Sequence, residues 1–268
     1  MFMRKVFIKL LIVLSLAALL AGGGYYAYKS FKYVKEEVPQ AVDSKELARE
    51  TTQEEVSNYA SEQAETGLTE QIKAPGPALP EELNLKLTFY AQAPFGNWDM
   101  PWQEACEEAS VLLVANEYKA ENWTAEQFND EILKLVDWEK KVFGDYKHTT
   151  VKETAKILNE YFGLKTLIYE NPTYEDVQKI IARGHFVVMT FDGKKIGNPF
   201  YKNGGPVYHA MVIKGYKSGE KVITADVGTR RGEDYVYSWK TLQNALHDYA
   251  VPMSDGAKRL LEVIPPAT

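Results

Sequence analysis

The only cysteine of this 268-residue chain, Cys106, lies in the stretch PWQEACEEASVLLV. A lone cysteine makes no disulfide within its own chain. Two interpretations remain open: a buried apolar thiol, or a nucleophile that needs a base, an orienting acid and an oxyanion donor elsewhere. Apolar residues at helical spacing follow Pro101, which predicts a helix that begins near Glu104. Cys106 would then lie in the first turn, where the helix dipole lowers a thiol pKa.

Of the four histidines, His209 is the best candidate for the base. It opens an apolar strand directly after the glycine-rich loop NPFYKNGGPVY. His148 and His247 lie in polar stretches, and we expect both at the surface. His185 begins another strand, and the pattern does not predict which way its side chain points.

An acid for His209 follows from the hairpin that the sequence predicts after it. If Tyr216 and Lys221 flank a four-residue turn, Asp226 lies opposite Met211 and on the same face of the sheet as His209. Asp226 and His209 are then diagonal neighbours, roughly 7–8 Å apart at the backbone, within reach of a hydrogen bond. A one-residue slip would move Asp226 to the other face. The alternative is a His and an Asp at strand ends that both face solvent.

Two glutamines are candidates for the side-chain donor to an oxyanion. Gln92 follows the first predicted strand, and Gln103 lies three residues before the cysteine, where the helix would turn it away. The positions favour Gln92, with the backbone N–H of Cys106 as the second donor. Glu107 and Glu108 carry charge that opposes a thiolate. At one and two residues along the helix, however, we expect them to point away from the sulfur.

The elements that must position these residues follow an α+β pattern, with helices before an antiparallel sheet. Capping boxes at Thr124, Thr150 and Thr173 predict three helices, which run to about residues 136, 161 and 183. Strands are predicted at 83–91, 185–191, 208–216, 221–227, 234–239 and 260–264, with a short helix at 239–246.

Residues 1–34 predict a membrane anchor. Arg4, Lys5 and Lys9 precede an uncharged run of nineteen residues, close to the ~20 that span a bilayer. The positive end is expected to stay cytoplasmic, which places everything after the anchor outside the cytoplasm at the cell membrane. A cleaved signal segment is the alternative, and it would give a secreted protein.

Residues 35–82 hold twelve Asp/Glu and four Lys/Arg. Few apolar residues accompany this charge, so we expect a flexible acidic spacer. Residues 83–268 are long enough to form one domain with its own core.

Composition and motifs exclude several classes of function. The chain has a net charge of −6 and no clustered Lys/Arg, so it is not expected to bind nucleic acid. It has no HExxH, paired-Cys or His cluster, so no metal is predicted. It also lacks a glycine-rich phosphate loop between a strand and a helix, so no cofactor is predicted.

Three parts of the sequence resemble the papain-like cysteine peptidases of family 39, which are related to the bacteriocin-processing, double-glycine-leader peptidases. The first is FYAQAPFGNW together with WQEACEEAS, the second is GGPVYHAMVIKGY and the third is ITADVGT. The resemblance covers about residues 85–250. It implies a papain-like fold whose site is formed by Gln92, Cys106, His209 and Asp226. The residue after the cysteine is Glu107, where many members have glycine.

The resemblance implies a cysteine peptidase, and the anchor predicted for residues 1–34 would make it membrane-anchored and extracytoplasmic. It would hydrolyse a peptide bond through a Cys–His–Asp triad and a thioester. Two alternatives stay open: a catalytically silent domain that binds peptides or a surface partner, and a related acyl-transfer or cell-wall amidase activity. Trp98, Trp102, Tyr201 and Tyr208 flank the predicted site, either as the lining of a peptide cleft or as part of the core.

Overall fold

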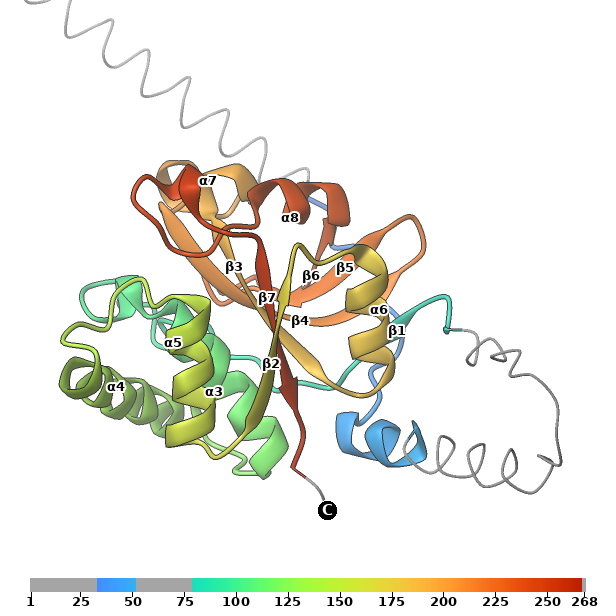
Figure 1. Ribbon diagram of the computed structural model, residues 1–268, viewed down its shortest axis with the longest axis horizontal. Helices are drawn as coiled ribbons and strands as arrows, with labels where there is room; N and C mark the ends of the chain where they lie inside the picture. The colour runs from blue at the N-terminus through green and yellow to red at the C-terminus, as the bar shows by residue number, and fades with distance from the viewer. Residues whose placement is uncertain (1–32, 52–78, 267–268) are drawn as a thin grey trace, which may run out of the picture.

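The chain folds as helices packed against one antiparallel sheet, which confirms the predicted α+β class (Figure 1). The computed structural model describes residues 33–51 and 79–266. The helices are α3 (Cys106–Lys119), α4 (Ala125–Val142), α5 (Val151–Lys156), α6 (Tyr174–Ala182), α7 (Gly193–Ile196) and α8 (Trp239–Ala245). Short helical turns are η1 (Trp102–Glu104), η2 (Ile157–Tyr161), η3 (Lys202–Gly204) and η4 (Met253–Asp255).

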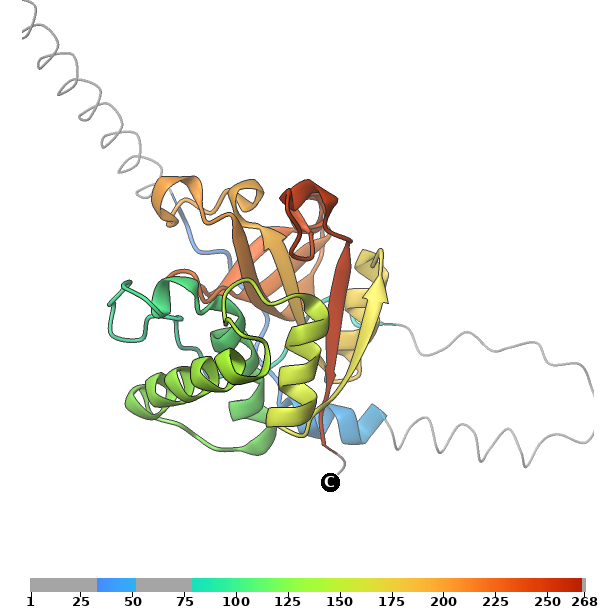
Figure 2. The same cartoon turned by 60° about the vertical axis from the view of Figure 1, so that its left-hand side comes forward.

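The strands are β1 (Leu83–Asn84), β2 (Lys165–Glu170), β3 (Phe186–Asp192), β4 (Tyr208–Lys217), β5 (Lys221–Ala225), β6 (Glu233–Ser238) and β7 (Arg259–Ile264). Their order in the sheet is β2-β7-β3-β4-β5-β6, and β1 pairs with one end of β4. Figure 2 shows α3, α4 and α5 grouped together beside the sheet, while α7 and α8 lie at its other end.

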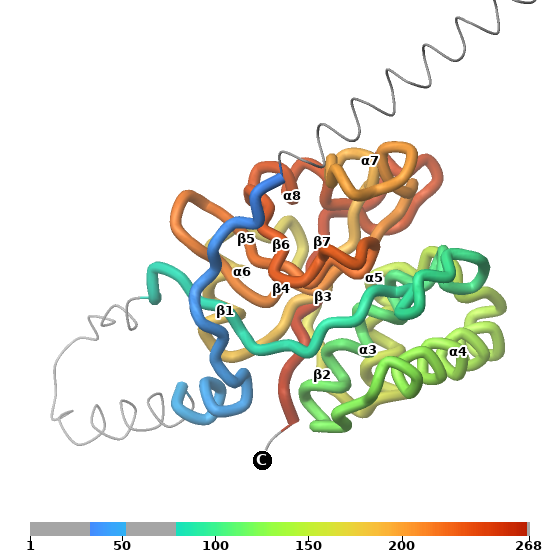
Figure 3. Tube along the Cα trace, turned by 180° about the vertical axis from the view of Figure 1, so that it is seen from behind, coloured from blue at the N-terminus to red at the C-terminus, as the bar shows by residue number. Residues whose placement is uncertain are grey.

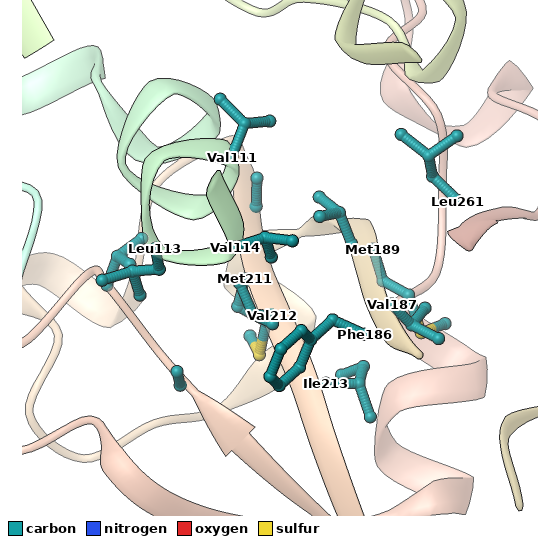
Figure 4. Packing of buried hydrophobic residues seen from close by; sticks show 14 of the residues in the cluster. Val111, Leu113, Val114, Phe186, Val187, Met189, Met211, Val212, Ile213 and Leu261 are labelled. Carbon is teal, nitrogen blue, oxygen red and sulfur yellow. The ribbon is translucent and has the colours of Figure 1, made fainter. Parts of the chain in front are cut away.

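Helix α3 is the centre of the domain. Nearly all of its residues are buried, as expected for a helix that is covered on every side. Figure 4 shows Val111 and Val114 pointing from this helix toward the strands that carry Met189 and Met211. Because α3 begins at Cys106 and packs on β4, this packing fixes the position of the cysteine against the strand that carries His209.

The three predicted capping boxes are present. In each, the threonine side chain accepts from the backbone N–H three residues on, and that residue's side chain accepts from the threonine N–H. Helix α4 is longer than predicted and ends at Val142, with Leu135, Val136 and Glu139 among its buried residues. Helix α5 continues through the π-helical turn η2 to Tyr161, so the predicted end at residue 161 is confirmed.

Two strand predictions differ from the structure. Of the predicted strand 83–91, only Leu83–Asn84 pairs with β4 as a strand, and Leu85 adds an isolated bridge to Val42. Its alternation is real, since Leu85 and Leu87 are buried. Strand β2 was not predicted from the sequence. This strand lies at the sheet edge, pairs only with β7, and leaves Leu167 51 % and Ile168 37 % exposed. Without a buried face it shows no strand pattern in the sequence.

The hairpin of β4 and β5 has the predicted register next to Asp226, although its turn differs from the predicted one. Lys217 pairs with Lys221 around a three-residue loop, so the predicted four-residue turn is wrong. A bulge between Ile213 and Gly215 then shifts the register by one residue. Beyond it Val212 pairs with Ala225, which is the pairing that the prediction requires.

Residues 33–51 pack against the domain, which differs from the expected flexible spacer over 35–82. Figure 3 shows this segment running past the β5–β6 end of the sheet toward β1. Val42 forms a parallel bridge with Leu85, and Tyr33 stacks on Tyr235 with ring centroids 5.1 Å apart. Residues 44–51 are helical, and Ser44 is fully buried. The rest of the predicted spacer, residues 52–78, lies outside the described residues.

The predicted anchor also lies outside the described residues, apart from its last two. Within residues 33–51 and 79–266, no helix is both long and apolar enough to cross a membrane.

Two acids are buried between α3 and α4. Glu108 and Glu139 are both fully buried. Apart from these two side chains themselves, no described group gives their carboxyl oxygens a hydrogen bond. Burial raises the pKa of Glu139 to about 9, and burial followed by the charge of Glu139 raises the pKa of Glu108 well above its usual value. A raised carboxyl pKa means that the folded state binds protons more tightly than the unfolded chain.

We predict that Glu139→Gln removes part of the pH dependence of stability. In the wild type, the contribution of Glu139 is fully present below the unfolded pKa, ~4.3, and is lost as pH rises toward 9. The variant should therefore be more stable than the wild type at pH 8–9, with the difference shrinking toward pH 5. Because one pKa unit corresponds to about 1.4 kcal/mol, the gap should reach a few kcal/mol.

Thermal unfolding of the full-length chain in detergent across pH 5–9 measures this gap. Asp137→Asn, which neutralises an exposed carboxylate on the same helix, is the control and should follow the wild-type profile. Parallel profiles for Glu139→Gln and the wild type would contradict the assignment.

Candidate active site

Cys106 is the first residue of α3, directly after the turn η1. Its side chain is 5 % exposed. The first N–H groups of a helix have no acceptor within it, so the Cys106 N–H is free to meet an anion. The Cys106 sulfur also interacts with the backbone of Ala210, the residue after His209. The helix start and β4 therefore meet at the cysteine.

His209 and Asp226 form the pair that the hairpin predicts. His209 Nε2 lies 2.9 Å from Asp226 Oδ1, and both side chains are buried, with exposed fractions of 1 % and 0 %. The alternative of two residues facing solvent is therefore wrong. Because Nε2 is engaged by the carboxylate, Nδ1 is the ring nitrogen left to exchange a proton with another group.

Asp226 is held by donors from three further segments. Asn198 Nδ2 donates to Oδ2 at 2.9 Å, and the hydroxyls of Tyr201 and Tyr237 donate to the same oxygen at 2.7 and 2.6 Å. The Gly228 N–H donates to Oδ1 at 3.1 Å. Burial alone would raise the pKa of Asp226, but the imidazole of His209 and the tyrosine hydroxyls outweigh it and lower that pKa.

These donors to Asp226 were not predicted from the sequence. Asn198 and Tyr201 belong to the loop before His209 that was singled out for its glycines, and Tyr237 lies on β6. The polar residues of that loop were the available signal.

Gly228 and Tyr201 enclose the His209 ring. The Tyr201 ring meets it edge-on, with centroids 5.3 Å apart. A Cβ added at Gly228 would lie 2.7 Å from His209 Cε1 and 3.1 Å from Tyr201 Cε1, closer than such atoms approach. Only glycine therefore leaves room for the imidazole in this orientation.

Glu107 does not point away from the sulfur, which corrects the expectation. Cys106 Sγ donates to Glu107 Oε2 at 2.8 Å, and the Thr149 N–H donates to Oε1 at 2.9 Å. The second bond folds the Glu107 side chain back over the first turn of α3. Burial first, and then the charge of Glu107 and the hydrogen bond to it, raise the pKa of the Cys106 thiol well above its usual value. Burial raises the pKa of Glu107 to about 7.

Gln92 lines the same cleft as the cysteine and is 4 % exposed. Its Nε2 donates to the carbonyls of Trp102 and Gln103 at 2.8 and 3.1 Å, so it ties the Gln92 loop to η1. Gln103 belongs to η1 rather than to the helix of the cysteine, and it is exposed at the cleft. Both glutamines therefore border the site, with Gln92 the more firmly held.

A cleft of about 560 Å³ brings the site residues together. Gln92, Cys106 and His209 all line it, and Asp226 lies behind His209. Of the four aromatic residues that flank the site in the sequence, Trp98, Tyr201 and Tyr208 line the cleft as well. Trp102 instead donates through Nε1 to Asn129 at 2.9 Å.

The other histidines do not line this cleft. His185 Nδ1 is 2.6 Å from Glu262 Oε1, and His148 stacks on Tyr249. His247 was expected at the surface but is only 8 % exposed, because it packs between α8 and β3.

The chain belongs to the Peptidase_C39 like family, whose model matches residues 84–250. Two solved structures are similar. One, from Bacillus anthracis and described as a "putative C39-like peptidase", is 15% identical; the match covers 70% of this chain and 100% of that chain, with a TM-score of 0.46. The other, UfSP from C. elegans, is 16% identical; the match covers 74% of this chain and 36% of that chain, with a TM-score of 0.36. No curated protein matches the chain.

We predict that Glu107→Gln makes the Cys106 thiol more acidic. The amide keeps the shape of the side chain and can still accept from Thr149, but it removes the negative charge beside the sulfur. The rate of alkylation by iodoacetamide, followed from pH 5 to 10, should reach its midpoint at a lower pH than in the wild type. At a fixed pH below both midpoints the rate should rise roughly ten-fold for each pKa unit lost.

The control is Glu117→Gln, which changes a half-buried acid at the far end of the same helix. It should keep the wild-type midpoint. An unchanged midpoint in Glu107→Gln would show that the carboxylate does not act on the thiol.

Proposed function

We propose that this chain is a cysteine peptidase with Cys106 as nucleophile, His209 as general base and acid, and Asp226 as the orienting group. One observation carries the proposal: a buried His–Asp pair lies in the same cleft as a cysteine at a helix N-terminus. The family supports a peptidase. Residues from three separate elements meet here, and a domain that only binds peptides needs no such combination.

In the proposed reaction, Nδ1 of His209 takes the thiol proton, and Sγ of Cys106 attacks the carbonyl carbon of the scissile peptide bond. The oxyanion that forms accepts from the Cys106 N–H and, once Gln92 Nε2 has released its hydrogen bond to the Gln103 carbonyl, from the side chain of Gln92. His209 then gives the proton to the leaving amine as the C–N bond breaks and the thioester forms. A water molecule, deprotonated by the same imidazole, hydrolyses the thioester and restores the thiol. Asp226 holds the ring through Nε2 throughout.

The Cys106 thiol must leave Glu107 before it can react. Its proton is donated to Glu107 Oε2 in this structure, which stabilises the thiol over the thiolate. A change in the side-chain torsion of Cys106 would exchange this acceptor for His209 Nδ1. Substrate binding in the cleft is the event that we propose favours this exchange, since it removes water and places a carbonyl beside the sulfur.

The hydrogen bond from Cys106 to Glu107 also supports a second candidate. A thiol held protonated is suited to a domain that binds peptides in the cleft without cleaving them. The two candidates differ in one respect: only the first consumes substrate. The site geometry at His209 and Asp226 favours catalysis.

We further propose that the domain is held at the outer face of the cell membrane by residues 1–34. The positive charges followed by nineteen uncharged residues support this topology. Protease added to intact cells should degrade residues 83–268, whereas a cytoplasmic reporter protein should survive. Protection of the domain until the cells are lysed would contradict the proposal.

We predict that Cys106→Ala and His209→Ala each lower peptide turnover by at least roughly 10³-fold, because members of one catalytic unit do not act additively. Gln92→Ala should lose ~10²–10³ in turnover as one oxyanion donor is removed. The assay is cleavage of a library of internally quenched peptides by the full-length chain in detergent, with products identified by mass spectrometry.

Two matched variants serve as controls. His148→Ala removes an imidazole outside the cleft, and Gln103→Ala removes the other glutamine; both should keep most of the wild-type turnover. Wild-type turnover by Cys106→Ala would reject the peptidase. A larger loss in Gln103→Ala than in Gln92→Ala would reverse the oxyanion assignment.

A further inference from the structure

The cleft is basic in an acidic protein. The chain carries a net charge of −6, yet the residues that line the cleft include three cations, Lys202, Arg230 and Arg231, and a single acid, Glu104. Glu104 Oε2 already faces His148 Nδ1 at 3.8 Å. The sign of the charge at the site is therefore opposite to that of the rest of the molecule.

No acid among the described residues neutralises these three cations. Among residues 33–51 and 79–266, none of the three forms an ion pair with an acid, whereas many other lysines and arginines do so. Arg231 lies over the Phe200 ring, with Cζ 4.7 Å from the centroid, which orients its guanidinium without neutralising it. The Arg230 Nη1 lies beside the loop that follows Gln92, 3.7 Å from a Cβ built on Gly96.

Their place in the fold ties them to the reacting groups. Arg230 and Arg231 lie in the loop that follows Asp226, and Lys202 lies in the turn η3, shortly before His209. Both segments also supply donors to Asp226, through Gly228 and Tyr201. A chain bound across Cys106 would therefore pass within reach of these charges.

We propose that the cleft selects acidic peptides, in which Asp or Glu lies within a few residues of the scissile bond. This inference rests on the proposed peptidase function. Arginine and lysine recognise carboxylates through charge-assisted hydrogen bonds. The three cations occupy the walls of the cleft that holds Cys106 and His209, so the anion that they meet is the substrate chain. A flat basic face, which would suit a membrane surface, is a different arrangement.

The test uses pairs of internally quenched peptides. The two peptides of a pair differ only at one position near the scissile bond, chosen from the results of the peptide library, where one has Glu and the other has Gln. The full-length chain is assayed in phosphatidylcholine nanodiscs. The Glu peptide should be cleaved with a kcat/KM roughly ten-fold higher than the Gln peptide, because partly exposed pairs contribute modestly. The ratio should fall toward one in 1 M salt, where charges are screened beyond ~3 Å.

The variant Lys202→Gln/Arg230→Gln/Arg231→Gln should abolish the Glu-over-Gln ratio. The matched control, Lys141→Gln/Lys152→Gln/Lys165→Gln, removes three exposed cations outside the cleft and should keep the ratio. Binding of the two peptides to Cys106→Ala, followed by fluorescence anisotropy, gives a readout that needs no turnover. It should show the same preference for the Glu peptide.

Several results would overturn the inference. Cleavage that depends on Cys106 but is equal for the two peptides would reject acidic selection and leave the peptidase standing. If no peptide is cleaved, equal binding to Cys106→Ala rejects the selection, whereas preferential binding keeps it and rejects only the catalysis. A Glu-over-Gln ratio of one in phosphatidylcholine nanodiscs would also overturn the inference. If the wild type and the triple variant then differ only in nanodiscs that contain phosphatidylglycerol, the cations bind anionic lipid.

Discussion

A carboxylate that is fully buried, Asp226, is the constraint on which the rest of the site depends. An isolated charge in the interior is strongly unfavourable, and it persists only when hydrogen bonds and an opposite charge offset the loss of water. Asp226 obtains these from His209, from two tyrosine hydroxyls, from an amide and from a backbone N–H. The donors come from the loop before β4, the loop after β5 and strand β6. The loops that form the cleft are thus fixed by the requirement that this one side chain be satisfied.

The same requirement fixes the sheet register. Asp226 reaches His209 only because a bulge in β4, between Ile213 and Gly215, shifts the pairing by one residue after the turn. Without the bulge, the alternation of strand side chains would turn Asp226 to the other face. A local irregularity of the backbone is in this way a condition for the His–Asp pair.

On the other side of the cysteine, Glu107 opposes the thiolate that the proposed attack requires. It accepts from the thiol, and its negative charge favours the thiol over the thiolate. Glu108 and Glu139 lie behind it in the interior between α3 and α4, where burial raises their pKa values and favours their neutral forms. The protonation state of Glu107, whose pKa burial raises to about 7, therefore affects the balance between thiol and thiolate.

The sequence was most informative where a residue's neighbours are local. Capping boxes depend on four consecutive residues, and Thr124, Thr150 and Thr173 were all identified correctly. The register at Asp226 was reached from a wrong turn, because nothing in the sequence distinguishes a four-residue turn from a three-residue turn followed by a bulge. Glu107 was placed wrongly because its direction depends on the Thr149 N–H, forty-two residues away in the chain. Contacts of that kind cannot be read from helical spacing.

The N-terminal segment shows a further consequence of such distant contacts. Its charge predicts a spacer, but Tyr33 packs edge-on against Phe200, with centroids 5.0 Å apart, and stacks on Tyr235. Phe200 in turn supports Arg231 at the cleft. Aromatic burial at a few positions therefore outweighs the acidic composition around them. The segment around Tyr33 is therefore held against the cleft wall at Phe200 and is not separate from the domain.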